Sequence, residues 1–382
     1  MEAKNLTIRE ILATNCKKTI EVELETDKCT VRASVPMGTS TGKYETISLP
    51  VKQVLKNFQD VKKNFILEDF YSQEEVDSKL RDIDKTPNFR KIGGNLALGI
   101  SSAYLKAFAI HNSQEVFEYF SGKKMPKPLA NVAGGWGEES EIQEFLLLPE
   151  RQKSFKDAVF RISEAYLDLG IILKKVDKTF KVSKNYESGW VTNISTKKLL
   201  DILSDLCKDY KLRIGMDVAA TDRWSGRTYV GRIKEKHRDF ISKLIKDFNV
   251  LYMEDPFHED DFDSFSWLTE NFKNTLICGD DLYATNPERL KIGIEKKATN
   301  SILIKPNQIG TITDVINVVD IAKKHRMTTV ISHRSGTTDE TLLCHLAVGL
   351  GCELAKFGIS GERIIKINEL FRIEEKIHAL GE

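Results

Sequence analysis

The segment from Arg213 to Phe357 contains five short apolar stretches, each ending in a residue with acid–base or metal-binding chemistry, and a sixth, shorter unit follows. The end residues are 37, 26, 25, 28 and 23 positions apart. Each spacing leaves room for one helix, which is the rhythm of strand–helix units in a parallel barrel. The sequence therefore predicts a β/α barrel. Its six end residues are Asp217, Glu254, Asp280, Lys305, His333 and Lys356.

The six end residues also predict one site, because the C-terminal ends of barrel strands meet at a single mouth. Three carboxylates around one point repel each other unless a cation lies among them. Oxygen ligands without Cys and with few His favour Mg²⁺ over Zn²⁺. Acids at strand ends can also be ordinary loop residues or helix N-caps. That explanation does not account for three in consecutive units, followed by two lysines and the His333-Arg-Ser sequence.

Composition narrows the class of protein. The 382 residues are 41% hydrophobic and 30% charged, as in globular proteins, with a formal net charge of +1. This balance gives no electrostatic reason to expect nucleic acid or a membrane surface as partner. The six cysteines are scattered without CxxC spacing, so neither a zinc site nor a disulfide framework is indicated. With no signal peptide and no apolar run of membrane-spanning length, we expect a cytoplasmic protein.

The N-terminal part reads as a smaller α+β unit. Alternating stretches at 19–26 and 29–35 predict a hairpin turning at Asp27-Lys28, followed by a Gly/Ser/Thr loop at 36–45. Helices are expected at 51–65, 72–83, 96–110 and 114–120. A basic, Pro-containing break at 121–128 suggests a boundary between an N-terminal domain, 1–126, and a C-terminal barrel, 127–382. The second unit has 256 residues, close to the roughly 250 of a typical barrel.

The barrel domain opens less regularly. Strands are expected at Pro128–Val132 and at Glu141–Pro149, separated by a Gly-rich loop, with helices at 153–175 and 195–210. Glu144 lies inside the second apolar strand. A glutamate there is either a site residue or an outward-facing edge position.

The chain resembles the enolase family over essentially its whole length. The motifs that carry this resemblance are Arg9-Glu-Ile-Leu, Val35-Pro-Met-Gly-Thr-Ser-Thr-Gly, Gln143-Glu-Phe, Ile214-Gly-Met-Asp-Val-Ala-Ala, Glu254-Asp-Pro-Phe, Gly279-Asp-Asp-Leu, Thr285-Asn-Pro, Leu303-Ile-Lys-Pro-Asn-Gln-Ile-Gly, Ser332-His-Arg-Ser-Gly and Arg372-Ile-Glu-Glu. The resemblance implies an N-terminal α+β domain capping a barrel whose first strands depart from simple alternation. It also implies Mg²⁺-dependent dehydration of 2-phosphoglycerate to phosphoenolpyruvate, an anionic small-molecule substrate and a homodimer.

The resemblance assigns roles to the matching residues. The general pattern for this superfamily is a Lys or His base acting with one or two Mg²⁺ ions. Lys305 would be the base, its pKa lowered by Mg²⁺ and Lys356, and Glu187 with Glu144 would assist departure of the hydroxyl. The other implied roles are metal ligands at Asp217, Glu254 and Asp280, a ligand to a second Mg²⁺ at Ser40, orientation by His333, and substrate binding by Lys356, Arg334, Ser335 and Gln143.

Four departures from the family pattern bear on the substrate. The loop before Gln143 lacks the family's histidine and carries Trp136 and two acids instead, which are unfavourable beside a phosphate. The other three are Met37 for the first serine of the mobile loop, Asn15 for an arginine, and Glu187-Ser-Gly-Trp190 for the family's Glu-Gly-Gly.

Three hypotheses follow. The chain is a divergent enolase in which Lys17 or Lys18 replaces the lost phosphate contacts, or an enolase-like lyase for a different, possibly phosphorylated hydroxycarboxylate, with Trp136 and Trp190 lining the pocket. The third is a non-catalytic binding protein. The metal triad together with Lys305 argues against the third, since a scaffold needs neither.

Overall fold

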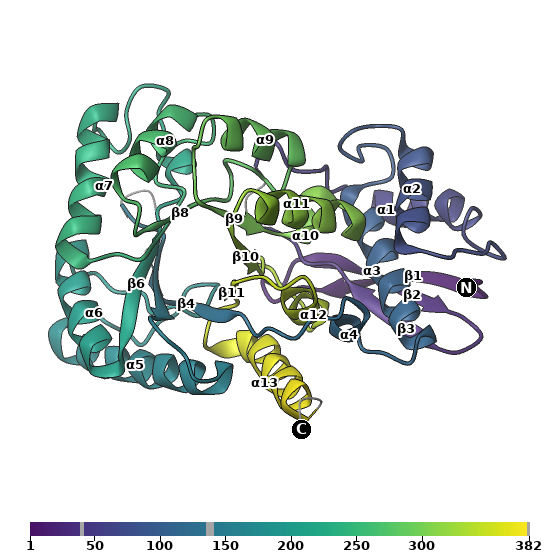
Figure 1. Cartoon of the computed structure of the whole chain (residues 1–382), viewed down its shortest axis with the longest axis horizontal. Coiled ribbons are helices and arrows are strands. Elements are labelled where there is room, and N and C mark those ends of the chain that lie inside the picture. The colour runs from purple at the N-terminus through teal and green to yellow at the C-terminus, as the bar shows by residue number, and fades with distance from the viewer. Residues whose placement is uncertain (39–41, 135–140, 380–382) are drawn as a thin grey trace.

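A closed eight-stranded barrel forms the larger part of the described residues (Figure 1). The structure is a computed structural model that describes residues 1–38, 42–134 and 141–379. Around the barrel the strands follow the order β10-β11-β4-β5-β6-β7-β8-β9. Their bounds are β4 Lys127–Gly134, β5 Glu144–Pro149, β6 Leu212–Asp217, β7 Tyr252–Glu254, β8 Leu276–Gly279, β9 Ser301–Ile304, β10 Thr328–Ser332 and β11 Leu354–Lys356. The predicted barrel is confirmed.

Strand β5 runs against both of its neighbours, while the remaining pairs in the barrel are parallel. The first residue of β5, Glu144, is therefore paired with Asp217 at the end of β6. The reversed strand begins at the rim where the parallel strands end, so Glu144 joins the strand-end residues. This arrangement confirms the expected departure from simple alternation and answers whether Glu144 faces inward or outward.

Helices surround the barrel and fill the intervals that the spacing predicted (Figure 1). Ser154, Ser195 and Thr311 cap three of them by accepting a backbone N–H, which satisfies donors left open at a helix start. The helices are α5 Phe155–Val176, α6 Thr196–Tyr210, α7 Lys234–Phe248, α8 Phe262–Asn271, α9 Pro287–Glu295, α10 Pro306–Ile309, α11 Ile312–Lys324, α12 Leu342–Gly349 and α13 Ile364–Ala379, with 3-10 turns η1 Ala220–Arg223 and η2 Gly361–Arg363. Those predicted at 153–175 and 195–210 are confirmed.

The N-terminal domain is an antiparallel sheet of three strands with helices on one side. The predicted hairpin is β2 with β3, whereas β1 lacks clean alternation and was not predicted. The helix at 114–120 is shorter than expected, because α4 covers only Val116–Tyr119. The bounds are β1 Asn5–Leu12, β2 Lys18–Glu25, β3 Thr30–Ser34, α1 Val51–Lys62, α2 Gln73–Asp84, α3 Gly94–His111 and α4 Val116–Tyr119.

Helix α3 joins the two domains. It contacts β2 and β3 on one side and α10 and α11 on the other, so nearly all of its side chains are buried. Polar contacts reinforce this junction: Arg81 pairs with Asp314 at 2.5 Å and Lys106 with Glu340 at 2.6 Å. The N-terminal domain is thereby held where its 42–46 segment reaches the barrel mouth. The boundary at residue 126 stays a prediction.

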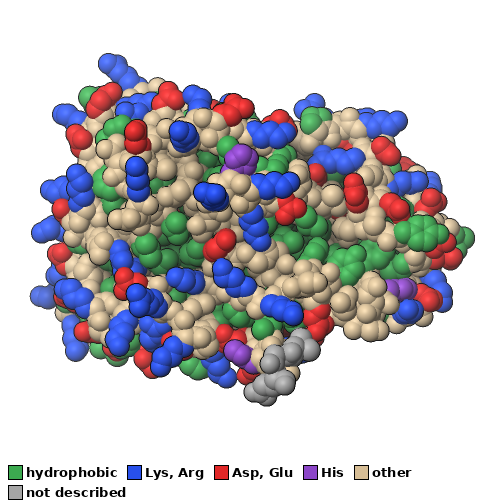
Figure 2. Space-filling model, in the orientation of Figure 1, with side chains coloured by type: hydrophobic (Ala, Val, Ile, Leu, Met, Phe, Trp, Pro, Cys, Tyr) green, Lys and Arg blue, Asp and Glu red, His purple; other side chains and the backbone are tan. Residues whose placement is uncertain are grey.

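The surface shows no concentration of one charge on the face seen in Figure 2, where Lys and Arg side chains are interspersed with Asp and Glu. Within the described part of the chain, no helix is both long and apolar enough to cross a bilayer.

Candidate active site

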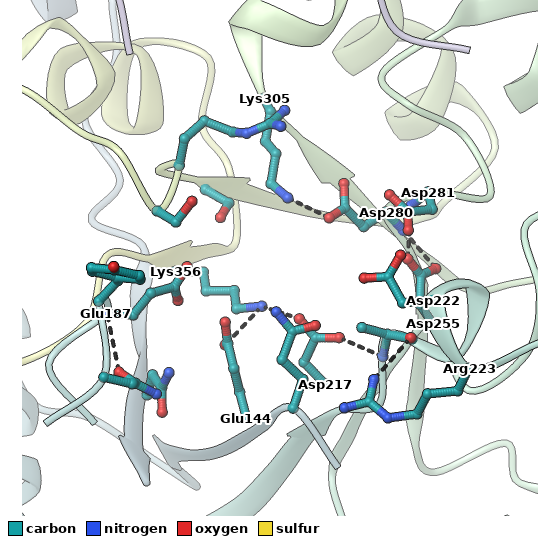
Figure 3. A pocket seen from close by; sticks show the side chains of 18 of the residues that line it. Glu144, Glu187, Asp217, Asp222, Arg223, Asp255, Asp280, Asp281, Lys305 and Lys356 are labelled. Carbon is teal, nitrogen blue, oxygen red and sulfur yellow. Dashed lines mark hydrogen bonds and ion pairs between the residues drawn. The ribbon is translucent and has the colours of Figure 1, made fainter. Parts of the chain in front are cut away.

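A cavity of about 680 Å³ opens at the barrel mouth (Figure 3). Among the described residues, eight acids but only four lysines and arginines line it, so the wall carries surplus negative charge. The acids are Glu45, Glu144, Glu187, Asp217, Asp222, Asp255, Asp280 and Asp281, and the bases are Arg223, Lys305, Arg334 and Lys356. An anionic ligand can enter such a site only with help from cations, because like charges in a low-dielectric cavity repel strongly.

Most of the predicted site residues meet in this cavity. Glu254 does not line it but lies directly beneath, with no exposed surface. Ser40 falls outside the described residues. The predicted residues that line the cavity are Gln143, Glu144, Glu187, Asp217, Asp280, Lys305, His333, Arg334, Ser335 and Lys356. Their proximity follows from the topology, while their individual roles stay predictions.

Lys356 is the hub of one group of charges. Its Nζ lies 2.9 Å from Asp217 Oδ2, 2.8 Å from Glu254 Oε2 and 3.0 Å from Glu144 Oε2. Burial opposes its charged form, but these carboxylates outweigh burial and raise the pKa of Lys356 well above its ordinary value. The lysine is therefore a fixed positive charge at the barrel mouth.

Glu254 retains an unused oxygen. Oε2 accepts hydrogen bonds from Lys356 and from the Tyr252 hydroxyl, whereas Oε1 is buried and has no hydrogen-bond partner among the described residues. Burial, followed by the nearby charge of Asp217, raises the pKa of Glu254 to about 8. A buried oxygen without a partner, in an all-carboxylate donor set with surplus negative charge, fits a hard divalent cation such as Mg²⁺.

Lys305 follows β9 and forms an ion pair with Asp280, which follows β8. Burial lowers the pKa of Lys305 and Lys356 lowers it further, but Asp280 outweighs both, so the pKa is raised. Lys356 therefore acts in the predicted direction, but the charge of Asp280, which the prediction did not include, outweighs it. The predicted effect of Mg²⁺ stays a prediction. Any base function requires that Asp280 be drawn away from the ammonium.

Asp255 holds the end of β8 and was not singled out in the sequence. Its two carboxylate oxygens accept the backbone N–H groups of Asp280 and Asp281 at 3.0 and 2.7 Å. Its backbone has φ +39°, an uncommon conformation for a residue other than glycine. The sequence contains one indication of this role, a second acid directly after Glu254. From the sequence, that acid was interpreted only as part of the Glu254-Asp-Pro-Phe motif.

Glu144 and Glu187 both line the cavity, and each shifts the pKa of the other. Burial and the Glu187 charge raise the pKa of Glu144 well above its ordinary value. For Glu187 burial acts in the same direction, but the polar groups of His333 and Glu144 beside it prevail and lower its pKa. These opposite shifts favour the protonated form of Glu144 and the charged form of Glu187.

Arg334 contacts a residue of the N-terminal domain. Its Nη1 donates to Glu45 Oε2 at 3.0 Å, and both side chains are buried. Glu45 lies in the 42–46 segment, where its other oxygen accepts the Gly42 N–H. Arg334, which was predicted to bind an anion, is thus paired with a carboxylate of the same chain in this structure.

The expectations for Trp190, Lys17 and Lys18 do not hold. Trp190 does not line the cavity: it is buried, stacks on Tyr166 with ring centres 4.8 Å apart and donates to the Tyr166 carbonyl. Lys18 pairs with Glu10 at 3.3 Å, and neither Lys17 nor Lys18 is among the described residues that line the cavity. Trp136 lies outside the described residues.

Comparison with known families matches both domains. A family profile described as "Enolase, C-terminal TIM barrel domain" matches residues 122–382, and one described as "Enolase, N-terminal domain" matches residues 3–120.

The chain belongs to the enolase family. Curated enolases are similar throughout: that of Archaeoglobus fulgidus is 37% identical over 98% of this chain and 98% of its own length. The enolases of Pyrobaculum aerophilum and Picrophilus torridus are each 37% identical over 98% of this chain, with 96% and 99% of their own lengths covered. Family membership confirms the prediction of an enzyme of the carbon–oxygen lyase class.

Proposed function

We propose that this chain catalyses the Mg²⁺-dependent dehydration of 2-phosphoglycerate to phosphoenolpyruvate. The observation that carries the proposal is that a lysine, Lys305, and a pair of glutamates, Glu144 and Glu187, line one cavity. Figure 3 draws Lys305 and Glu144 reaching into the cavity from opposite sides. Such an arrangement can remove a proton from one carbon and deliver another to a hydroxyl on the next.

Asp217, Glu254 and Asp280 would hold Mg²⁺, and when bound it would stabilise the negative charge that develops on the substrate carboxylate after proton removal. A second ion, with Ser40 among its ligands, is part of the proposal by family resemblance.

Lys305 acts as the base for the proton on C2. Its pair with Asp280 keeps it charged in the protein alone, so Asp280 must turn to another cation before Nζ can accept a proton. Burial, Arg334 and Lys356 then act in one direction, all favouring the neutral amine.

Glu144 and Glu187 complete the elimination. The electron pair of the broken C2–H bond forms the C2–C3 double bond, and the C3 hydroxyl leaves with the proton stored on the Glu144–Glu187 pair, as water. His333 lies against this pair, with its Nε2 3.8 Å from Glu187 Oε2. Burial, then the neighbouring Arg363, lowers the pKa of His333 to about 3, so it serves as a neutral orienting group.

Substrate binding falls to the remaining cations and polar groups. Lys356 and Gln143 would bind the carboxylate end, and Arg334 with Ser335 the phosphate. To bind the phosphate, Arg334 either gives up its hydrogen bond to Glu45 or keeps it and contacts both groups. We further propose, from the resemblance, a cytoplasmic homodimer, which light scattering during size-exclusion chromatography would check.

The test is turnover of 2-phosphoglycerate with Mg²⁺, followed by the ultraviolet absorbance of phosphoenolpyruvate. Wild type should be active and Lys305→Ala should lose about 10³-fold or more in kcat. Lys291→Ala, which breaks a surface pair with Glu288, is the matched control and should be unaffected. Inactive wild type that still binds Mg²⁺ would instead indicate a lyase for a different hydroxycarboxylate, or a binding protein if no hydroxycarboxylate turns over.

A further inference from the structure

Arg363 is a fully buried arginine to which the steps above assign no proton transfer and no substrate contact. It ends η2, the turn that leads into α13. The ion pair that the structure gives it within the described residues is a long one, 3.6 Å from Nε to Glu362. Burying a guanidinium is costly unless its donors are used, so its hydrogen bonds indicate its purpose.

Those hydrogen bonds join two loops of the active site. Nη2 donates to the carbonyl of Tyr186 at 2.7 Å and to that of Ser335 at 2.8 Å, and Nη1 donates to the carbonyl of Arg334 at 2.9 Å. Tyr186 precedes Glu187, and the other two follow His333. One planar fork therefore sets the spacing between the segment that carries Glu187 and the segment that carries the anion-binding residues.

The same guanidinium also faces the His333 ring. Nη1 lies 3.5 Å from His333 Nδ1. An arginine has only donors, so Nδ1 must be the ring nitrogen without a proton, and the proton of the neutral ring lies on Nε2. Nε2 is the nitrogen that faces Glu187.

Two glycines make room for this arrangement. A Cβ on Gly358, whose φ is +75°, would lie 3.0 Å from Arg363 Cγ. A Cβ on Gly361, whose φ is +63°, would lie 2.4 Å from Ser188 Oγ. The segment before α13 is thus packed closely against the loop that carries Glu187.

We propose that Arg363 is a positioning residue: its guanidinium fixes the Tyr186–Ser188 loop against the His333–Ser335 segment and selects the His333 tautomer protonated on Nε2. The effect on turnover rests on the proposed function, whereas the effect on the tautomer does not.

The first experiment is independent of substrate. Nitrogen-15 NMR of histidine-labelled full-length chain reports which ring nitrogen carries the proton, with His333→Asn identifying the His333 signal. Wild type should show the Nε2-protonated form, and Arg363→Met should shift His333 toward the other tautomer or a mixture. An unchanged His333 signal in a folded Arg363→Met protein overturns the proposal.

The second experiment measures kcat and KM for 2-phosphoglycerate with Mg²⁺. Arg363→Met should lower kcat by about 100-fold, as a misplaced catalytic group does, and raise KM by less. Arg363→Lys should recover little, because one ammonium cannot span three carbonyls, while guanidinium ion added to Arg363→Ala should restore part of kcat. If Arg363→Met does not fold, Arg363→Lys takes its place in both experiments, with the same expected direction.

The matched control is Arg161→Met. Arg161 likewise donates to three carbonyls, those of Arg151, Tyr210 and Lys211, but it lies on α5 away from the cavity. It should keep kcat and the His333 tautomer. An equal loss of kcat in Arg161→Met and Arg363→Met would mean that Arg363 has only a structural role. A wild type inactive on 2-phosphoglycerate would refute the proposed substrate and leave the NMR result to decide on Arg363.

Discussion

The candidate active site has two halves that are built differently. The strand-end half, Asp217, Glu254, Asp280, Lys305 and Lys356, stands on or directly after barrel strands. The loop half consists of Glu45, Glu187, His333 and Arg334. These residues lie in three segments: the one between β3 and α1, the one between α5 and α6, and the one directly after β10.

The two halves differ in what holds them. In the strand-end half, neighbouring strands fix the backbone, and the side chains contact each other directly, as Lys356 does with three acids. In the loop half, the positions of the side chains depend on contacts with residues of other segments. Glu45 of the N-terminal domain contacts Arg334, and the guanidinium of Arg363 contacts the backbone of the loops. Mutations in the first half should therefore alter charge and cation binding, and mutations in the second should alter geometry.

The largest effect is expected for Glu254→Gln in the strand-end half. Glutamine keeps the shape but removes the ligand charge, so Mg²⁺ affinity should fall by at least about 100-fold. The metal-free protein should keep its stability, because Glu254 with a pKa of about 8 is already largely protonated near neutral pH.

Thermal unfolding with and without Mg²⁺ measures both effects, since a ligand stabilises only the state that binds it. Glu288→Gln, at an exposed acid, is the control. A loss of metal-free stability with unchanged Mg²⁺ stabilisation would break the distinction between the halves.

The second prediction concerns His333 and pH. Its pKa of about 3 in the fold lies below the ordinary 6.5, so the unfolded chain binds an extra proton between these values. Stability from the neutral ring is fully present above pH 6.5 and is lost as pH falls, by about 1.4 kcal/mol per pH unit.

Urea unfolding at pH 7 and pH 5 should therefore show a pH dependence that is smaller in His333→Asn by about 2 kcal/mol over this interval. His237, buried on α7 with a pKa of about 4, gives a comparison outside the cavity, and His237→Phe should lessen the slope similarly. If only His237→Phe has an effect, the pKa of His333 in the fold does not differ from that in the unfolded chain.

Gly358→Ala should have a smaller effect. A left-handed backbone costs alanine about 1 kcal/mol, and here the new Cβ also meets Arg363. Gly226→Ala is the matched control, because φ is +86° there and nothing lies within 4 Å of the new Cβ. The excess loss of stability in Gly358→Ala over Gly226→Ala, measured by chemical unfolding, isolates the packing against Arg363, and no excess would mean that the segment moves freely.

The smallest effect is expected for Glu45→Gln. It keeps a hydrogen-bond acceptor for Arg334 but removes one of the surplus acids, so KM for the anionic substrate should fall by about fivefold, equivalent to about 1 kcal/mol. Steady-state kinetics measures this, and Glu45→Ala, which also loses the acceptor, should gain less. A higher KM in Glu45→Gln would show that the charge of Glu45 is needed to orient Arg334.

The residues of the strand-end half could be predicted from the sequence, because in a barrel the spacing of the strands along the chain determines where the strand ends lie. Once short apolar stretches recur with room for one helix, the residues at their ends must meet at the mouth. The place of Glu144 could be predicted only in part, since its apolar neighbours in the sequence indicated a strand but not the direction of that strand. The pKa of Lys305 could not be read, because Asp280, Lys356 and Arg334 act on it through distances that only the fold sets.

The sequence by itself determined the barrel, the family and the acids and lysines at the strand ends, because periodicity and motif order are local properties of the chain. Only the tertiary structure decided three features. Trp190 packs in the core, Glu45 accepts a hydrogen bond from Arg334, and Arg363 donates hydrogen bonds to two loops. These contacts join residues up to 289 positions apart. Hydrogen bonds to backbone carbonyls leave no mark on residue type, so no pattern in the sequence could have revealed the role of Arg363.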